Sequence, residues 1–228
     1  MPLVFPLPDA LPRTRKAAMA LLLPDTLPTL QTVTGRFVLA PFTALDVEPL
    51  ARLLARDEIW SQGFSDSEAR PAGEAELTAF VDRRFAGLQV FSVYQKLPLG
   101  QSRFVGTTGI TEHEDATERV KIGRTVLDPD LWGAKVNHEV KITLLDWLFS
   151  CGAGRIECDV DARNQRSLAS LVRFGFTAEG TRRRSSRNVD GLWRDFVILS
   201  LLTEEWPELR PRALASLAGQ MPAGLLAV

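Results

Sequence analysis

Residues 159–176 read DVDARNQRSLASLVRFGF, the end of one strand, a short helix and the start of another strand. Residues 155–160 alternate apolar and charged side chains, which is typical of a half-buried strand. Asn164 stands where a helix N-cap is expected, and Ser167 follows with its hydroxyl on the first turn. This polar pair either serves a ligand at the edge of the sheet or only caps the helix, and the spacing leaves both interpretations open.

Outward from this stretch, the hydrophobic period switches between that of helices and that of strands. The expected elements are a strand at 36–39, helices at 44–55 and 74–85, strands at 90–94, 104–111 and 120–127, a helix at 136–149, a strand at 155–160, a helix at 164–174, and strands at 176–187 and 193–201. Asp190-Gly191 is a specific hairpin signal between the last two strands. The order β-α-α-β-β-β-α-β-α-β-β predicts one α/β domain with a mixed sheet (α+β).

The two ends of the chain differ from this pattern. Residues 1–30 hold six prolines, too many for a regular helix or a central strand. We expect an extension that lies over the body or is partly disordered, a domain at 31–206, and an Ala/Leu/Pro tail at 207–228. A true start at Met19 instead of Met1 is left open.

The composition is that of an ordinary globular protein and excludes several classes. The chain has 228 residues, of which 45% are hydrophobic and 24% charged, with a formal net charge of -1. This near-neutral balance argues against nucleic-acid binding as the main activity. The only cysteines and histidines, Cys151, Cys158, His113 and His138, have neither zinc-ligand nor redox spacing, so we expect a reducing cytoplasm and read Cys158 as a core residue. No apolar run is long enough for a membrane span.

Several motifs occur together in the order of a known family. They are Asn164-x-x-Ser167, Phe174-Gly175-Phe176, Glu179-Gly180 and Asp190-Gly191-x-Trp193-Arg194-Asp195. Residues 132–141, which read WGAKVNHEVK, are similar to the pattern Gln-Gly-x-Gly-Val-Asn-x-Glu-x-Lys. Over residues 33–206 the chain resembles the GCN5-related N-acetyltransferase (GNAT) superfamily, most closely the branch of bacterial enzymes that acetylate ribosomal-protein N-termini. The resemblance implies the GNAT acyl-CoA N-acyltransferase fold and acetyl-CoA as cosubstrate.

The resemblance also implies where the cosubstrate binds. The loop at 132–137 would bind pyrophosphate through backbone NH groups at a helix N-terminus. The implied cofactor-binding residues are Val126 and Leu127 for the thioester carbonyl, Trp132, Gly133, Ala134, Lys135, Val136 and Asn137 for the phosphates, Asn164 for the pantetheine arm, and Arg163 and Arg166 as phosphate partners. Two positions depart from the family. Trp132 replaces Gln or Arg and is read as a packing residue, while Lys135 replaces Gly, which restricts the approach of the backbone. Lys135 is either a point charge for phosphate or a solvated surface lysine.

The catalytic groups are less well marked. The resemblance places Ser167 beside the sulfur as general acid. The branch often has Glu just before the Ile-Gly of the fourth strand, where this chain has Lys121. Glu112 is our candidate base, with Glu114 on the same strand face and a water chain to either carboxylate as alternatives.

Residues 163–187 hold seven arginines and one acidic residue. Alternation along a strand sends neighbouring arginines to opposite faces, so they cannot all meet one ligand. Most are expected to be solvated, and an RNA- or ribosome-facing role for 182–187 is left open. Acceptor specificity is expected from the loop at 60–71, through Asp66 and Glu68 or an apolar wall of Trp60 and Phe64, and from the hairpin at 188–192. An ordinary polar loop is an equally good reading.

These observations predict a cytoplasmic acetyl-CoA-dependent N-acetyltransferase in which an amine attacks directly within a ternary complex. The expected acceptor is a protein N-terminal amine, with a small-molecule amine as the enzymatic alternative. Lys121 and the altered loop at Trp132 and Lys135 suggest a second alternative, a catalytically weak acyl-CoA-binding sensor or partner-binding module. No membrane partner and no metal are expected, and a homodimer is left open.

Overall fold

The computed structural model describes residues 20–61, 64 and 68–218. Eight strands form one sheet in the order β1-β2-β3-β4-β5-β6-β8-β7. The strands are β1 (Leu30–Gln31), β2 (Phe37–Pro41), β3 (Val90–Lys96), β4 (Ser102–Glu114), β5 (Arg119–Leu127), β6 (Arg155–Asp161), β7 (Thr177–Arg187) and β8 (Trp193–Leu202). The α-helices are α1 (Val47–Leu54), α2 (Asp57–Trp60), α3 (Glu74–Phe85), α4 (Val136–Ser150), α5 (Gln165–Phe174) and α6 (Trp206–Ala215).

The order of elements predicted from the sequence is confirmed, with three additions. The edge strand β1, the single-turn helix α2 and the C-terminal helix α6 were not expected. The hairpin turn at Asp190-Gly191 joins β7 to β8 as predicted, and Gly191 has a positive φ of 76°. The chain is therefore a mixed α/β fold.

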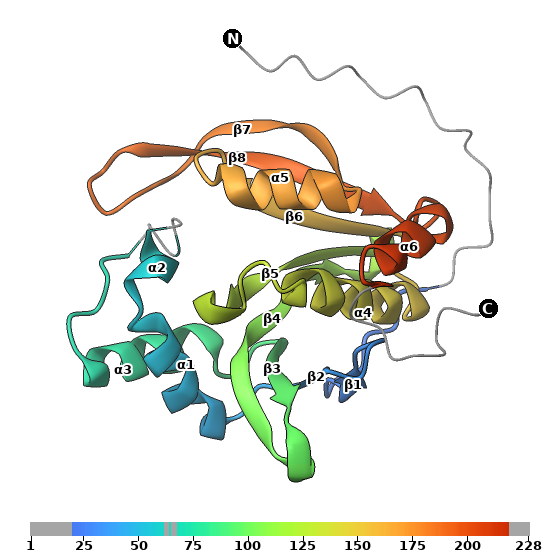
Figure 1. The fold of residues 1–228 in the computed structure, drawn as a ribbon. Helices are drawn as coiled ribbons and strands as arrows, with labels where there is room; N and C mark the ends of the chain where they lie inside the picture. The colour runs from blue at the N-terminus through green and yellow to red at the C-terminus, as the bar shows by residue number, and fades with distance from the viewer. Residues whose placement is uncertain (1–19, 62–63, 65–67, 219–228) are drawn as a thin grey trace.

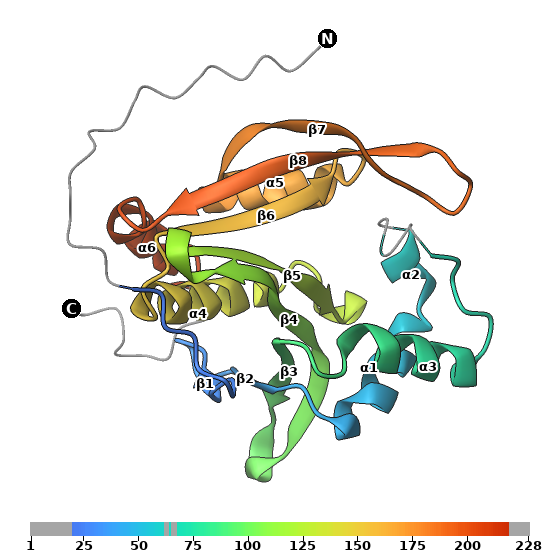
Figure 2. The ribbon, with the colours of Figure 1, turned by 180° about the vertical axis from the view of Figure 1, so that it is seen from behind.

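Helices cover the sheet on both faces. Phe80, Val81 and Leu54 from α1 and α3 pack on one face against Val90 and Val126 of the strands. The other face carries α4, α5 and α6, whose apolar side chains form the larger core. In Figure 1 α4 and α5 lie in front of the strands, and in Figure 2, seen from behind, the strands lie in front of these helices.

The sheet is weakly joined at its centre, between β5 and β6. These two neighbours are parallel, and they pair only at Arg119–Lys121 with Arg155–Glu157. The rest of β5, residues 122–127, pairs with β4 alone, and the rest of β6, residues 158–161, pairs with β8 alone. The backbones of the two strands therefore separate beyond Lys121, and this separation is the opening between β5 and β6 (Figure 1).

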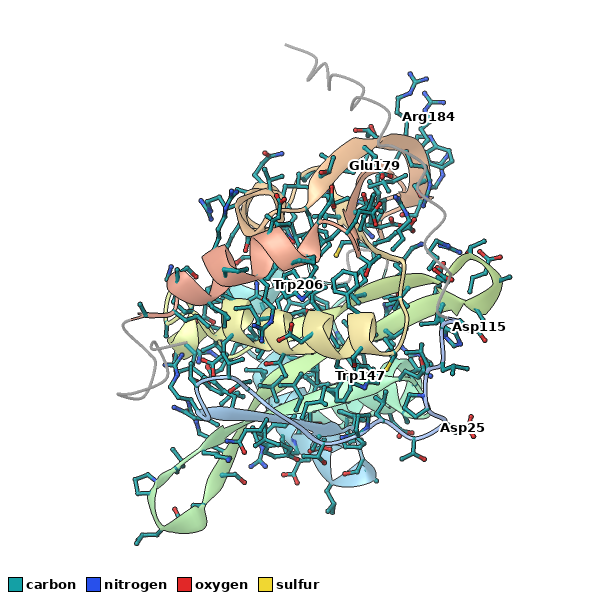
Figure 3. The ribbon with its side chains drawn as sticks, turned by 90° about the vertical axis from the view of Figure 1, so that its right-hand side faces the viewer. Asp25, Asp115, Trp147, Glu179, Arg184 and Trp206 are labelled. Atoms are coloured by element: carbon teal, nitrogen blue, oxygen red, sulfur yellow. The ribbon has the colours of Figure 1, made fainter. Side chains whose placement is uncertain are left out.

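The described parts of both predicted extensions lie against this body. Leu21 and Leu27 are buried in the larger core, and the backbone NH of Leu22 donates to the carbonyl of Cys151 at 2.8 Å. At the other end, Ala213 and Leu217 are buried in the larger core, and Arg210 donates from Nε to Asp146 at 2.7 Å; Trp206, labelled in Figure 3, begins this helix. Within residues 20–61, 64 and 68–218, no helix is both long and apolar enough to cross a membrane.

Candidate functional site

A bulge in β5 borders the opening between the two strands. Between the Gly109–Gly123 and Thr107–Val126 pairs, β5 has one more residue than β4, and Arg124 there adopts a left-handed φ of 52°. The hydroxyl of Thr107 donates to the carbonyl of Arg124 at 2.8 Å and so holds the bulge. The backbone of Val126, predicted to polarise a thioester, follows this bulge directly.

The predicted pyrophosphate loop leads into the N-terminus of α4. Gly133 has a φ of 87°, and Lys135, the N-cap residue, has a left-handed φ of 64°. The NH groups of the first turn, from Val136 onward, have no partner within a helix and carry its positive dipole end. The Oδ1 atom of Asn137 is buried, and no described residue hydrogen-bonds to it. These features fit an anionic ligand with an additional donor group near Asn137.

Trp132 links this loop to the start of α5. Its indole Nε1 donates to the carbonyl of Leu127 at 3.1 Å, which agrees with the predicted packing role. The guanidinium carbon of Arg166 lies 3.8 Å from the centroid of the indole ring, a close cation–π contact. Arg166 is exposed, so its positive charge lies beside Trp132 at the surface of this loop.

The first turn of α5 has the expected cap. The side chain of Asn164 accepts a hydrogen bond from the backbone NH of Ser167 at 3.0 Å, which confirms Asn164 as N-cap. Ser167 is half-buried, and its hydroxyl has no hydrogen-bond partner in the described part of the chain. The cap therefore uses the backbone NH of Ser167 and leaves its hydroxyl available to contact a ligand.

Arg163 is held by a neighbouring carboxylate. Its guanidinium binds Asp161 through Nε at 3.0 Å and through Nη2 at 2.7 Å, and Arg194 binds the same carboxylate at 2.8 Å. Burial opposes ionisation of Asp161, but the hydrogen bonds from Arg163 and Arg194 hold its pKa well below the usual range. Half of the Arg163 side chain is still exposed, so it can face solvent anions from this position.

Four charged side chains meet where β5 and β6 separate, one of them Arg182 on β7, whose Nη1 lies 3.2 Å from Asp159. Lys121 Nζ lies 3.2 Å from Glu112 on β4 and 3.2 Å from Asp159 on β6. Partial burial opposes the charge on Lys121, but hydrogen bonds to Glu112 and Asp159 raise its pKa above the ordinary value. Glu112 is 56% exposed, whereas Asp159 is 18% exposed and its Oδ1 is buried without a hydrogen-bond partner among the described residues.

Asp159 was not among the residues singled out from the sequence. The only signal was that it is a charged residue in the alternating pattern of β6, on the face opposite Cys158. Its contact with Lys121 depends on the register between two parallel strands, which a sequence pattern does not give. Glu112 lies where it was predicted, with Lys121 and Arg119, at 3.9 Å, as ion-pair partners.

A buried carboxylate at the start of α4 holds the predicted pyrophosphate loop in place through Arg36. Glu139, on the first turn of α4, is fully buried and accepts hydrogen bonds from Thr32, Thr34 and Arg36. Arg36 also donates to the carbonyl of Ala134 at 3.4 Å. The turn between β1 and β2 thereby holds the predicted pyrophosphate loop in place.

The predicted acceptor segments are partly described. Trp60 and Phe64 pack edge to face at 5.3 Å, and both contact the buried Phe80, so the two rings pack against the smaller core. Glu68 is bound by Arg83 and Arg84, and Asp66 lies outside the described residues. The hollow between α1 and α3 is lined by Ala51, Ala55, Pro71 and Leu77 among others, none of them from the opening at β5 and β6.

The cysteines and potential metal ligands are not part of this arrangement. Within the described ranges, no group of three or more His, Cys, Asp or Glu residues is placed to hold a metal ion. Cys158 is buried, and burial raises its pKa to about 11, so its thiol stays protonated at neutral pH. Cys158 is a core residue, as predicted.

The comparisons with known proteins agree with this geometry. The family model described as "Acetyltransferase (GNAT) domain" matches residues 36–177. A putative acetyltransferase from T. thermophilus is 27% identical with a TM-score of 0.70, over 84% of this chain and 98% of that one. A GCN5-related N-acetyltransferase from Brucella melitensis is 23% identical with a TM-score of 0.74, over 84% and 86% of the two chains. The structure of Mycobacterium smegmatis RimJ in complex with CoA-disulfide is 23% identical with a TM-score of 0.64, over 86% and 96%. No curated protein matches the sequence.

Proposed function

The chain belongs to the GNAT acetyltransferase family, and on that premise we propose that it moves an acetyl group from acetyl-CoA to a primary amine, the N-terminal amine of a protein. The motifs of the ribosomal-protein acetyltransferase branch support this acceptor, as does the similarity in fold to RimJ. The observation that carries the proposal is the opening beyond Lys121, bordered by the bulge of β5 and by the N-terminus of α4.

The residues around the opening fit the parts of acetyl-CoA. The NH groups of the first turn of α4 bind the pyrophosphate, with Lys135 and Arg166 as nearby cations. The pantetheine arm lies along the edge of β5 that faces β6, where residues 122–127 have no paired strand, and it reaches Asn164 across the opening. An extended chain of amide groups suits such an edge, because the strand offers unpaired backbone donors and acceptors.

The chemistry then needs three groups of this chain. A backbone NH at Val126 or Leu127 polarises the thioester carbonyl, while the neutral amine attacks the carbonyl carbon. As the new C–N bond forms and the C–S bond breaks, Ser167 donates its hydroxyl proton to the departing thiolate and later recovers one from water. A carboxylate, directly or through water, takes the proton that the amine loses.

Two carboxylates are candidates for that proton. Glu112 was predicted from the sequence, and Asp159 lies on β6 at the second position beyond its last pair with β5. Both carboxylates form an ion pair with Lys121 at 3.2 Å. We favour Asp159, because it is the more buried of the two and its Oδ1 is not used by the described residues.

The proposal is tested in two steps on the full chain. Calorimetry with acetyl-CoA and with CoA should show binding of both, and release of free CoA thiol should show turnover with short peptides that have a free N-terminus. N-terminally blocked peptides of the same sequence are the matched control and should give no thiol. Binding without turnover on any amine would support the acyl-CoA-binding module instead, and turnover only on small amines would support that acceptor class. Absence of binding would overturn all three.

A further inference from the structure

Arg124 is a partly buried cation beside the opening. It occupies the bulge of β5, two residues before Val126, on the part of the strand that pairs with β4 alone. Its side chain lies on the face covered by α1 and α3, because its Nη1 donates to the carbonyl of Arg84 at 2.8 Å and its guanidinium lies 5.7 Å from the ring of Phe85. This is the face opposite α4 and the predicted pyrophosphate loop.

The charge of Arg124 is not compensated by the residues around it. No carboxylate in the described part of the chain pairs with it, and its Nε is buried without a hydrogen-bond partner there. The neighbouring Arg84, which Glu68 binds, has the same charge. Burial and this neighbour lower the pKa of Arg124, although a guanidinium remains charged at neutral pH.

Such an arrangement is costly unless something else uses it. A buried donor without a partner and a cation without a counter-charge both destabilise the fold. Most other arginines near the opening do have carboxylates, such as Arg163 with Asp161 and Arg119 with Glu157. Arg124 differs from these in that no described carboxylate pairs with it and only its Nη1 has a hydrogen-bond partner among the described residues, which leaves donors for a ligand carboxylate.

We propose that Arg124 binds a carboxylate of the acceptor, so that the enzyme prefers amines with an acidic group close by. The proposal rests on the proposed function, because it needs an acceptor that approaches the thioester carbon from the face opposite α4. For a peptide, the carboxylate belongs to an acidic residue at the first position. For a free amino acid, it is the α-carboxylate next to the amine, which has the same chemistry.

A purely structural role for Arg124 makes a different prediction. The carbonyl of Arg84 is one of the last in α3 and lacks a partner within that helix, so Arg124 also caps α3. If capping were its whole role, loss of the guanidinium would weaken the fold and lower turnover with every acceptor by the same factor. The ratio between two acceptors separates the two roles, because it cancels a common effect.

The test measures kcat/KM, expressed per concentration of neutral amine, for matched acceptors at saturating acetyl-CoA. One pair consists of peptides that begin with Asp or Asn, and a second pair consists of free glycine and glycinamide. The wild type should prefer the carboxylate member of one pair by roughly tenfold to a hundredfold. A preference in the first pair identifies a peptide side chain as the source of the carboxylate, and a preference in the second pair identifies a free amino acid. In Arg124→Gln this ratio should fall to about one, and Arg124→Lys should keep part of it. Arg52→Gln, an exposed arginine on α1, is the matched control and should keep the full ratio.

Two results would overturn the inference. The first is turnover with no preference in either pair, and the second is a preference that Arg124→Gln leaves intact. If no acceptor is turned over, the proposed function fails, and binding of the same four compounds in the presence of CoA then decides the inference separately. Equal affinities within each pair would overturn it, and tighter Arg124-dependent binding of a carboxylate member would support it.

Discussion

Removal of the buried carboxylate of Glu139 should destabilise the fold and loosen the predicted pyrophosphate loop together. The side chain of Glu139 is 0% exposed, and that of Arg36 is 30% exposed. Arg36 binds Glu139 through Nη2 at 2.7 Å and through Nε at 3.2 Å. Removing one partner of a buried ion pair costs about 3 to 5 kcal/mol. We expect about 3 to 4 kcal/mol for Glu139→Ala, since Arg36 regains some water and Thr32 keeps its hydrogen bond to the carbonyl of Phe37.

For a chain of this size, 1 kcal/mol lowers Tm by about 2 to 4 °C, so Glu139→Ala should lower Tm by about 6 to 16 °C. Urea unfolding followed by circular dichroism gives the free energy independently. The control is Glu48→Gln, which removes an exposed ion pair with Arg52 at 3.6 Å and should change stability by less than about 0.5 kcal/mol. The variant should also bind acetyl-CoA more weakly, because Arg36 no longer holds Ala134. A Glu139→Ala protein as stable as the control would refute the reasoning.

Three further predictions follow from the site. Ser167→Ala should lower kcat by about a hundredfold and leave acetyl-CoA affinity and Tm unchanged, since Asn164 caps the helix through the backbone NH of Ser167; an unchanged kcat would exclude the acid role. Asp159→Asn should lower kcat more than Glu112→Gln does, because Asp159 is the more buried carboxylate and its Oδ1 is unused by the described residues, and the reverse result would return the role to Glu112. Burial lowers the pKa of His138, so the unfolded chain binds a proton on this imidazole at a higher pH than the folded chain does. The wild-type Tm should therefore fall as pH drops below about 6.5, and the Tm of His138→Gln should fall less. An equal dependence of Tm on pH in the two proteins would contradict this prediction.

Most of the fold was predictable because its signals are local. Helix and strand periods, the Asp190-Gly191 turn and the Asn164 cap depend on neighbours within a few residues, and each is where the sequence placed it. The missed elements lack such signals. Strand β1 has only two residues, and α6 begins with Trp206-Pro207 and contains Pro211, a composition that argues against a helix.

The site was predictable only in part, because its contacts join distant segments. Asp159 meets Lys121 through the register of parallel strands, and Glu139 meets Arg36 across more than a hundred residues of chain. Nothing in the sequence around either carboxylate indicates its partner. The family resemblance gave the positions of the loop and of Ser167, but not the left-handed backbone of Lys135 or the contact of Arg166 with Trp132.

The short pairing between β5 and β6 divides the sheet into two parts, β1 to β5 and β6 to β8, which are joined at one corner. Three residue pairs connect the two parts, and the ion pairs Lys121–Asp159 and Arg119–Glu157 also cross this connection. Separating the two parts beyond these pairs breaks no backbone hydrogen bond between strands, but it is opposed by the two ion pairs and by the larger core, in which α4 packs against strands of both parts. All four side chains are at most 30% exposed, so salt screens these ion pairs less than exposed ones, and the connection stays stiff as ionic strength rises.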